Sequence, residues 1–137
     1  MDFKTSLPKL AVVGVMIAAA VIVFGKMRGP SDESAAVNIK VPMLSAMAVQ
    51  GEKLFEVNCS SCHGKNGSGT EQGPPLIHKI YEPNHHGDMS FVLAAKRGVQ
   101  AHHWPFGNMP AQPQVSENDV LVIVGYVREL QRANGIN

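Results

Sequence analysis

Both cysteines of the 137-residue chain lie in one short stretch, NCSSCHGKNGSG, and a histidine directly follows the second of them. The order Cys59-x-x-Cys62-His63 puts two thiols and an imidazole within reach of one another. Such residues bind metals, carry out thiol redox chemistry or attach a haem covalently. These kinds of site place different demands on the rest of the chain, so the remaining sequence discriminates between them.

A zinc site, a redox dithiol and a plain disulfide each lack something that they require. Structural zinc needs four ligands, and the other histidines do not follow a regular spacing that would complete the set. A redox dithiol is expected beside the strands of a βαβ unit, and no strand pattern is present. A disulfide between residues three apart would close almost no loop. These alternatives remain open but disfavoured.

Covalent attachment of one haem c makes the best use of this spacing. Thioether bonds from Cys59 and Cys62 would fix two edges of the porphyrin, and the helical turn between them would bring His63 to one face of the iron. We therefore take these three residues as candidates for haem attachment and for the first axial ligand.

Two helices are predicted at the ends of the region around this motif. The first spans residues 46–58, and its apolar stripe consists of Met47, Gly51, Leu54 and Phe55. The last helix opens at Ser116, has Asp119 three residues later and ends before Gly135. One face of this last helix carries Val120, Ile123, Val124, Val127 and Leu130.

The intervening residues, 64–114, hold most of the glycines, prolines and histidines. They contain one further helical pattern, DMSFVLAAKRGV, which Asp88 or Ser90 is expected to cap and Gly98 to end. The rest of this segment is expected to be loop that wraps around a bound group. Because no alternating strand pattern is present, the sequence predicts an all-α domain wrapped around one covalent haem.

The N-terminus has the layout of a signal anchor. Lys4 and Lys9 precede an unbroken apolar run over residues 10–24, and no small-x-small cleavage pattern follows that run. A cleaved signal peptide is the alternative, although cutting at Ala20 would leave only a short apolar run. The predicted organisation is a signal anchor or transmembrane segment at 1–28, a flexible tether at 29–45 and the haem domain at 46–137.

Over residues 46–136 the chain resembles the class I c-type cytochromes. The family's haem motif matches the two cysteines and the histidine described above. Its glycine and aromatic residue on the first helix, which cross an aromatic residue on the last, match at Gly51, Phe55 and Tyr126. The resemblance implies a close helix crossing at Gly51, where no side chain holds the two backbones apart.

The family's G-P-x-L motif matches GPPL at residues 73–76. The resemblance implies that the Pro74 carbonyl accepts the Nδ1 proton of His63 and that Leu76 lies against the porphyrin. A stiff loop without this hydrogen bond is the alternative. The resemblance also implies a location outside the cytoplasm, because this kind of haem is attached on the outer side of the bacterial inner membrane.

Met109, in FGNMPAQ, stands where the family places its second axial ligand. Its rivals are Met89, in a predicted helix, and His102 and His103. A thioether ligand stabilises ferrous iron and raises the potential relative to a second histidine. If Met109 does not bind the iron, the open position would instead allow peroxide chemistry or binding of a small gas.

The segments HKIYEPNHHGDMS and AHHWPFGNM carry five of the six histidines. One interpretation treats these as surface residues, with a histidine or Trp104 bonding a haem propionate in the pocket. A second hypothesis is a further metal site, for copper, formed by His85, His86, His102 and His103.

The charge balance excludes a nucleic-acid partner, because 12 basic and 11 acidic residues leave a net charge of +1 and no dominant basic patch. No role is assigned to Arg128 and Arg132, which are expected on the outer side of the last helix.

We expect a membrane-tethered periplasmic electron carrier with a redox-protein donor and acceptor and no small-molecule substrate, hence not an enzyme. The alternatives are a haem subunit of a larger membrane oxidoreductase and a soluble periplasmic form if the leader is cleaved.

Overall fold

The computed structural model describes residues 38–137, and the predicted anchor lies outside the described residues. This part of the chain is helical, and its β pairing is limited to an isolated bridge between Val99 and Met109. The all-α prediction is therefore confirmed for the described residues. No helix among them is both long enough and apolar enough to cross a membrane. The elements are α2 (Ala46–Asn58), α3 (Ser60–His63), the 3₁₀ turns η1 (Lys65–Gly67) and η2 (Lys79–Tyr81), α4 (Asp88–Arg97) and α5 (Glu117–Ala133).

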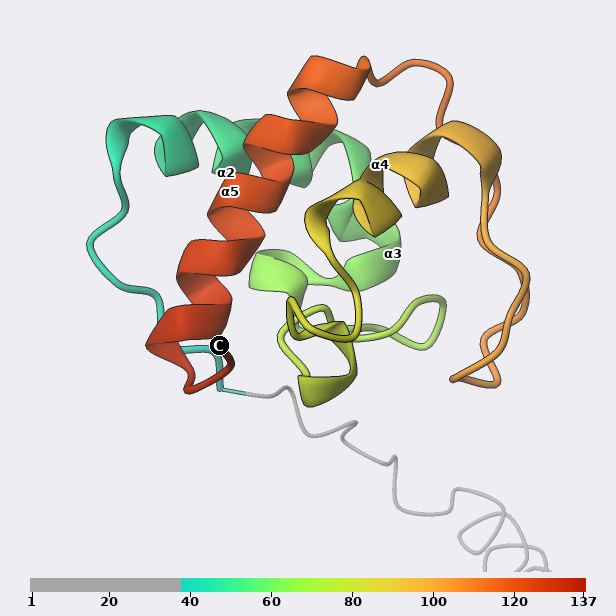
Figure 1. Cartoon of the computed structure of the whole chain (residues 1–137), viewed down its shortest axis with the longest axis horizontal. Coiled ribbons are helices and arrows are strands. Elements are labelled where there is room, and N and C mark those ends of the chain that lie inside the picture. Colours follow the sequence, from blue (N-terminus) through green and yellow to red (C-terminus); the bar gives the residue numbers. More distant parts are fainter. Residues whose placement is uncertain (1–37) are drawn as a thin grey trace, which may run out of the picture. The chain divides into compact units, whose positions relative to one another are not determined.

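Helix α5 forms as the sequence predicts. The Ser116 hydroxyl accepts a hydrogen bond from the Asp119 backbone N–H at 3.1 Å and donates one to the Asp119 carboxylate at 2.7 Å. One of the first-turn N–H groups that have no partner within the helix is thereby paired. The five apolar positions predicted for its inner face are all buried. In Figure 1 this red helix lies across α2, and it also packs against α4.

The crossing of α2 and α5 is centred on Gly51. A Cβ atom at this position would collide with the Val122 carbonyl oxygen and lie 2.8 Å from the Tyr126 Cβ. One turn further along α2, the rings of Phe55 and Tyr126 are tilted against each other with centroids 5.7 Å apart, and both side chains are 0% exposed. The crossing implied by the family resemblance is therefore present.

The predicted stripe of α2 is wrong at one position. Met47 is 63% exposed, whereas Ala48 is buried together with Gly51 and Phe55. Because successive residues turn by about 100° around a helix, the close contact at Gly51 rotates the Ala48 side of α2 toward α5 and leaves Met47 beyond the edge of the buried face.

The start of α4 also differs from the prediction. Gly87 occupies the N-cap position, not Asp88 or Ser90, and the Ser90 hydroxyl donates to the Gly87 carbonyl at 2.6 Å. The end agrees, because Gly98 closes the helix with a positive φ of 77° and its N–H bonds the Ala94 carbonyl.

The described end of the predicted tether packs onto the helical domain. The backbone of Lys40 exchanges two hydrogen bonds of 2.9 Å with the Asn134 side chain. Ser45 caps α2 by accepting from the Ala48 N–H, and its hydroxyl donates to the Glu129 carboxylate at 2.5 Å. These hydrogen bonds from Ser45 are the main cause that lowers the pKa of Glu129. The packed domain therefore begins before residue 46.

Replacing Gly51 with alanine tests the helix crossing. Gly51→Ala is expected to lower the free energy of unfolding by about 1–3 kcal/mol, because the new methyl group meets the α5 backbone. Gly125→Ala in α5 is the matched control, since a Cβ there meets nothing within 4 Å and helix propensity alone favours alanine by up to about 1 kcal/mol. Urea unfolding followed by circular dichroism measures both. Equal stability of the two variants would contradict the proposed crossing contact.

Candidate haem site

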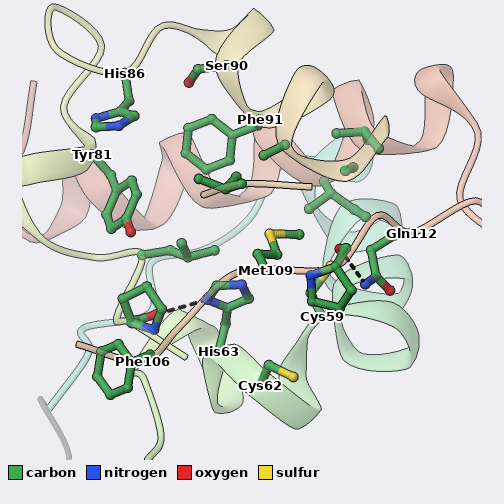
Figure 2. A pocket seen from close by; sticks show the side chains of 18 of the residues that line it. Cys59, Cys62, His63, Tyr81, His86, Ser90, Phe91, Phe106, Met109 and Gln112 are labelled. Carbon is green, nitrogen blue, oxygen red and sulfur yellow. Dashed lines mark hydrogen bonds between the residues drawn. The ribbon is translucent and has the colours of Figure 1, made fainter. Parts of the chain in front are cut away.

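A cavity of about 470 Å³ opens between α3, α4, α5 and the loop that follows α4. Its volume falls within the range of roughly 300–1,000 Å³ that is typical of pockets for small molecules and cofactors. Its walls are mainly apolar. All of the site residues proposed from the sequence line it: Cys59, Cys62, His63, Pro74, Leu76, Trp104 and Met109. Figure 2 shows several of these side chains around the cavity.

Cys59 directly precedes the short helix α3, and Cys62 lies within it. The Cys59 N–H continues α2 by bonding the Phe55 carbonyl at 2.8 Å, and the His63 N–H bonds the Cys59 carbonyl at 2.9 Å. Both thiols are free; Cys59 is partly buried and Cys62 is exposed. Burial, followed by the nearby Cys62, raises the pKa of Cys59 to about 11. A redox dithiol needs the opposite shift, so the environment of Cys59 argues against that alternative.

His63 is oriented by a backbone carbonyl. Its Nδ1 lies 2.9 Å from the Pro74 oxygen, and because a carbonyl only accepts, Nδ1 carries the proton and Nε2 keeps a free lone pair. Burial lowers the pKa of His63, and the hydrogen bond to Pro74 opposes that effect. Gly73 allows the loop to approach, since a Cβ there would lie 2.7 Å from the Cys62 carbonyl oxygen. The ring is thus presented as a neutral imidazole with one nitrogen available to a metal.

Met109 reaches the same cavity from the loop between α4 and α5 (Figure 2). Its backbone is fixed by two hydrogen bonds with Val99, of 2.9 and 3.0 Å. Gly98 makes room for this pairing, because a Cβ there would lie 2.6 Å from the Met109 carbonyl oxygen. Its rival Met89 is 53% exposed on α4 and does not line the cavity. His102 and His103 lie at the rim and are exposed.

Trp104 supplies a test of whether haem fits this cavity. Its indole Nε1 is buried and has no hydrogen-bond partner among residues 38–137. The nearby Tyr81 hydroxyl does not meet the geometry of a hydrogen bond with this N–H. Burial raises the pKa of Tyr81, and the Trp104 side chain opposes this by a smaller amount. A buried N–H donor without an acceptor is costly. A haem propionate is an acceptor of the required kind, so the lining fits the group.

Sequence reasoning missed Arg128. This residue is only 7% exposed, and its guanidinium joins three segments: Nε bonds Asp88 at 2.8 Å, Nη1 bonds the Tyr81 carbonyl at 2.7 Å, and Nη2 bonds the His86 carbonyl at 2.5 Å. The expectation that Arg128 lies on the outer side of α5 is therefore wrong. Its position four residues after Val124 placed it on the buried face, and that spacing was the available signal.

The comparisons with known proteins identify the family of the chain. The family model for cytochrome c matches residues 48–131. The Cbb3-type cytochrome c oxidase subunit CcoP of Rhodobacter capsulatus is 30% identical over 94 residues, which cover 65% of this chain and 31% of that protein. Cytochrome c oxidase subunit 2 of Alkalihalophilus pseudofirmus is also 30% identical over 94 residues, covering 62% of this chain and 26% of that protein. The chain thus spans less than a third of the length of either relative.

The chain belongs to the cytochrome c family, because the match covers more than half of its residues. It contains a cytochrome c electron-transfer domain, which carries a covalent c-type haem and serves as an electron carrier rather than as an enzyme. Its similarity to the oxidase subunits is distant.

Arg128→Lys tests the junction that holds one wall of the site. A lysine cannot reproduce the planar fork, so the His86 carbonyl loses its donor and the Tyr81 carbonyl keeps only the Gln131 amide. The free energy of unfolding is therefore expected to fall by about 1–3 kcal/mol. Arg132→Lys, on the exposed side of the same helix, is the control and is expected to stay within about 0.5 kcal/mol of wild type. Urea unfolding compares them. Equal losses in the two variants would show that the junction contributes no stability.

Proposed function

We propose that the haem is bound through thioethers of Cys59 and Cys62, and that His63 Nε2 and the Met109 sulfur are its axial ligands. The observation that carries this proposal is that all four side chains line one apolar cavity. In that cavity the Pro74 carbonyl accepts the proton on His63 Nδ1, which leaves Nε2 free to bind the iron. Leu76 and Trp104 complete the pocket, as an apolar wall and as a donor to a propionate. When bound, haem c supplies an iron that takes up and releases one electron.

The protein's part in this function is to keep the ligand set unchanged. Pro74 fixes the tautomer of His63, and the backbone pairing with Val99 holds the segment of Met109 in place. Two axial ligands from the protein leave no position for substrate, which suits a carrier. A sulfur ligand favours the ferrous state, so we propose a higher potential than bis-histidine ligation would give.

The side of the cavity at Cys62 is the proposed docking surface for redox partners. Cys62 and Ser61 are exposed there, whereas Cys59 is partly buried on the inner side. Donor and acceptor proteins would bind this surface in turn. Small and weak interfaces, typical of electron-transfer partners, permit such rapid exchange.

We further propose that residues 1–28 anchor the domain as a single span in the bacterial inner membrane, with the haem on the periplasmic side. Lys4 and Lys9 before the apolar run form the basic region of a signal anchor, and the attachment of this kind of haem outside the cytoplasm gives the orientation. The packing of residues 39–45 on α5 shortens the proposed tether to roughly ten residues, which reach at most about 35 Å when extended. The domain would therefore stay near the membrane surface. Cleavage of the leader would give a soluble periplasmic carrier instead.

A second candidate function is a haem-bearing subunit of a larger membrane oxidoreductase. The observation that favours it is that the relatives named above are subunits of cytochrome c oxidases. Purification in mild detergent distinguishes the two functions. A stable complex with further subunits in constant ratio would support the subunit role, and isolation of this chain alone would support the shuttle.

Met109→Ala tests the axial ligand and, with it, the assignment as a carrier. The oxidised wild-type protein is expected to show the far-red sulfur-to-iron absorption band. The variant should lose that band, have a lower potential and bind carbon monoxide when reduced, because a position on the iron opens. Met89→Ala, on the exposed face of α4, is the matched control and should retain all three wild-type properties. A wild-type protein that lacks the band and a Met109→Ala variant identical to it would contradict Met109 as the axial ligand.

A further inference from the structure

His86, His102 and His103 line the haem cavity, and His85 packs beside them against His86 and His103. His85 and His86 follow η2, whereas His102 and His103 precede Trp104 in the loop after α4. The fold stacks the rings of His85 and His86 at 4.7 Å and brings His103 to 5.2 Å from His85. Side chains from two distant loops thus converge on one point, and nothing in the proposed electron transfer requires them to do so.

Ring nitrogens of His85, His86 and His103 all lie within 4.8 Å of one another. His85 Nε2 and His103 Nε2 are 3.3 Å apart. Two imidazole nitrogens on one tetrahedral zinc ion, each about 2.0–2.1 Å from the metal, are separated by about 3.3–3.4 Å. The observed spacing therefore suits two ligands of one ion, as well as the hydrogen bond that the rings form without it.

His86 is already held as a ligand would be. Its Nδ1 lies 2.6 Å from the Ile80 carbonyl oxygen, so Nδ1 carries the proton and Nε2 has a free lone pair. A histidine that binds a metal almost always donates its other N–H to a carbonyl or carboxylate in this way. The His86 carbonyl is in turn bonded by Arg128 at 2.5 Å, which fixes the backbone of this loop to α5.

We propose that His85, His86 and His103 bind one divalent transition-metal ion of the zinc or copper type at the rim of the haem cavity. A set of neutral imidazoles without a carboxylate suits these metals and not magnesium or calcium. His85 and His103 are exposed, so their rings are free to turn toward the ion. Three imidazoles leave the fourth position of a four-coordinate ion for water or for a ligand from a partner protein.

His102 is outside the proposed ligand set, which differs from the four-histidine hypothesis suggested by the sequence. Its Nδ1 lies 2.8 Å from the Gln100 carbonyl oxygen, and its ring centroid is 6.2 Å from that of His86. The site therefore uses three imidazoles. It also uses neither His63 nor Met109, so it can be filled while the proposed haem ligands stay in place.

Isothermal titration of zinc chloride into the haem-loaded, oxidised protein, purified without a polyhistidine tag, tests the proposal. We expect one zinc ion per chain and no heat from magnesium chloride. His85→Ala and His103→Ala each remove an exposed ligand, so each should weaken zinc binding at least about tenfold. His102→Ala is the matched control from the same cluster and should bind zinc as wild type does.

The haem absorption spectrum, recorded during each titration, checks that the variants are folded and that zinc acts at the histidine cluster. It is expected to stay unchanged in all four proteins. Absence of zinc binding would show that these rings form surface hydrogen bonds only and would overturn the proposal. Unweakened binding in His85→Ala and His103→Ala, or a loss in His102→Ala as large as theirs, would overturn the ligand set. Spectral changes that persist in His85→Ala would place the metal at the haem ligands and contradict the site.

Discussion

The close approach of α2 and α5 at Gly51 is the contact on which the haem cavity depends. It sets the direction in which α2 runs, and α2 leads directly into Cys59 and α3. The same contact buries Tyr126, whose hydroxyl bonds the Asn66 side chain at 3.0 Å and so ties the loop after the haem motif to α5. Gly51 itself does not line the cavity. A methyl group added there would nevertheless shift α2, and with it the Cys59 and α3 that follow, relative to α5.

Two regions of the chain complete the cavity around this frame, and each is held by backbone groups. The loop at Pro74 meets His63 from one side, and the segment of Met109 is paired with Val99 on the other. Arg128 fastens a third segment, between η2 and α4, by bonding two of its carbonyls. An apolar cavity bordered by fixed polar groups suits a large apolar cofactor, and the buried N–H of Trp104 marks a place where that cofactor must offer an acceptor.

Local patterns in the sequence were enough to predict the parts of this structure that depend on neighbours along the chain. They gave the bounds of α2, the Ser116 cap and the buried face of α5, because helical periodicity and capping are local properties. The site residues followed from a short motif and a family resemblance, and the structure brings them to one cavity. Their roles in binding the haem stay predictions.

Features that depend on tertiary contacts were not predicted. Periodicity put Met47 on the buried stripe, but the rotation of α2 follows from the contact at Gly51. An arginine on a helix is usually solvated, and the groups that pair the buried guanidinium of Arg128, namely Asp88 and two loop carbonyls, lie far from it in the sequence. The sequence suggested a cluster of four histidines, but which of their rings meet depends on two loops whose paths no local pattern specifies.

The intact mass of the denatured protein, produced in cells that can attach haem c, tests the central claim most directly. The account predicts the mass of the polypeptide plus one haem, a haem that stays with the chain after acid and organic solvent, and the bare mass for the Cys59→Ser/Cys62→Ser double variant. A wild-type chain with the bare polypeptide mass, or a double variant that still retains haem after denaturation, would contradict it.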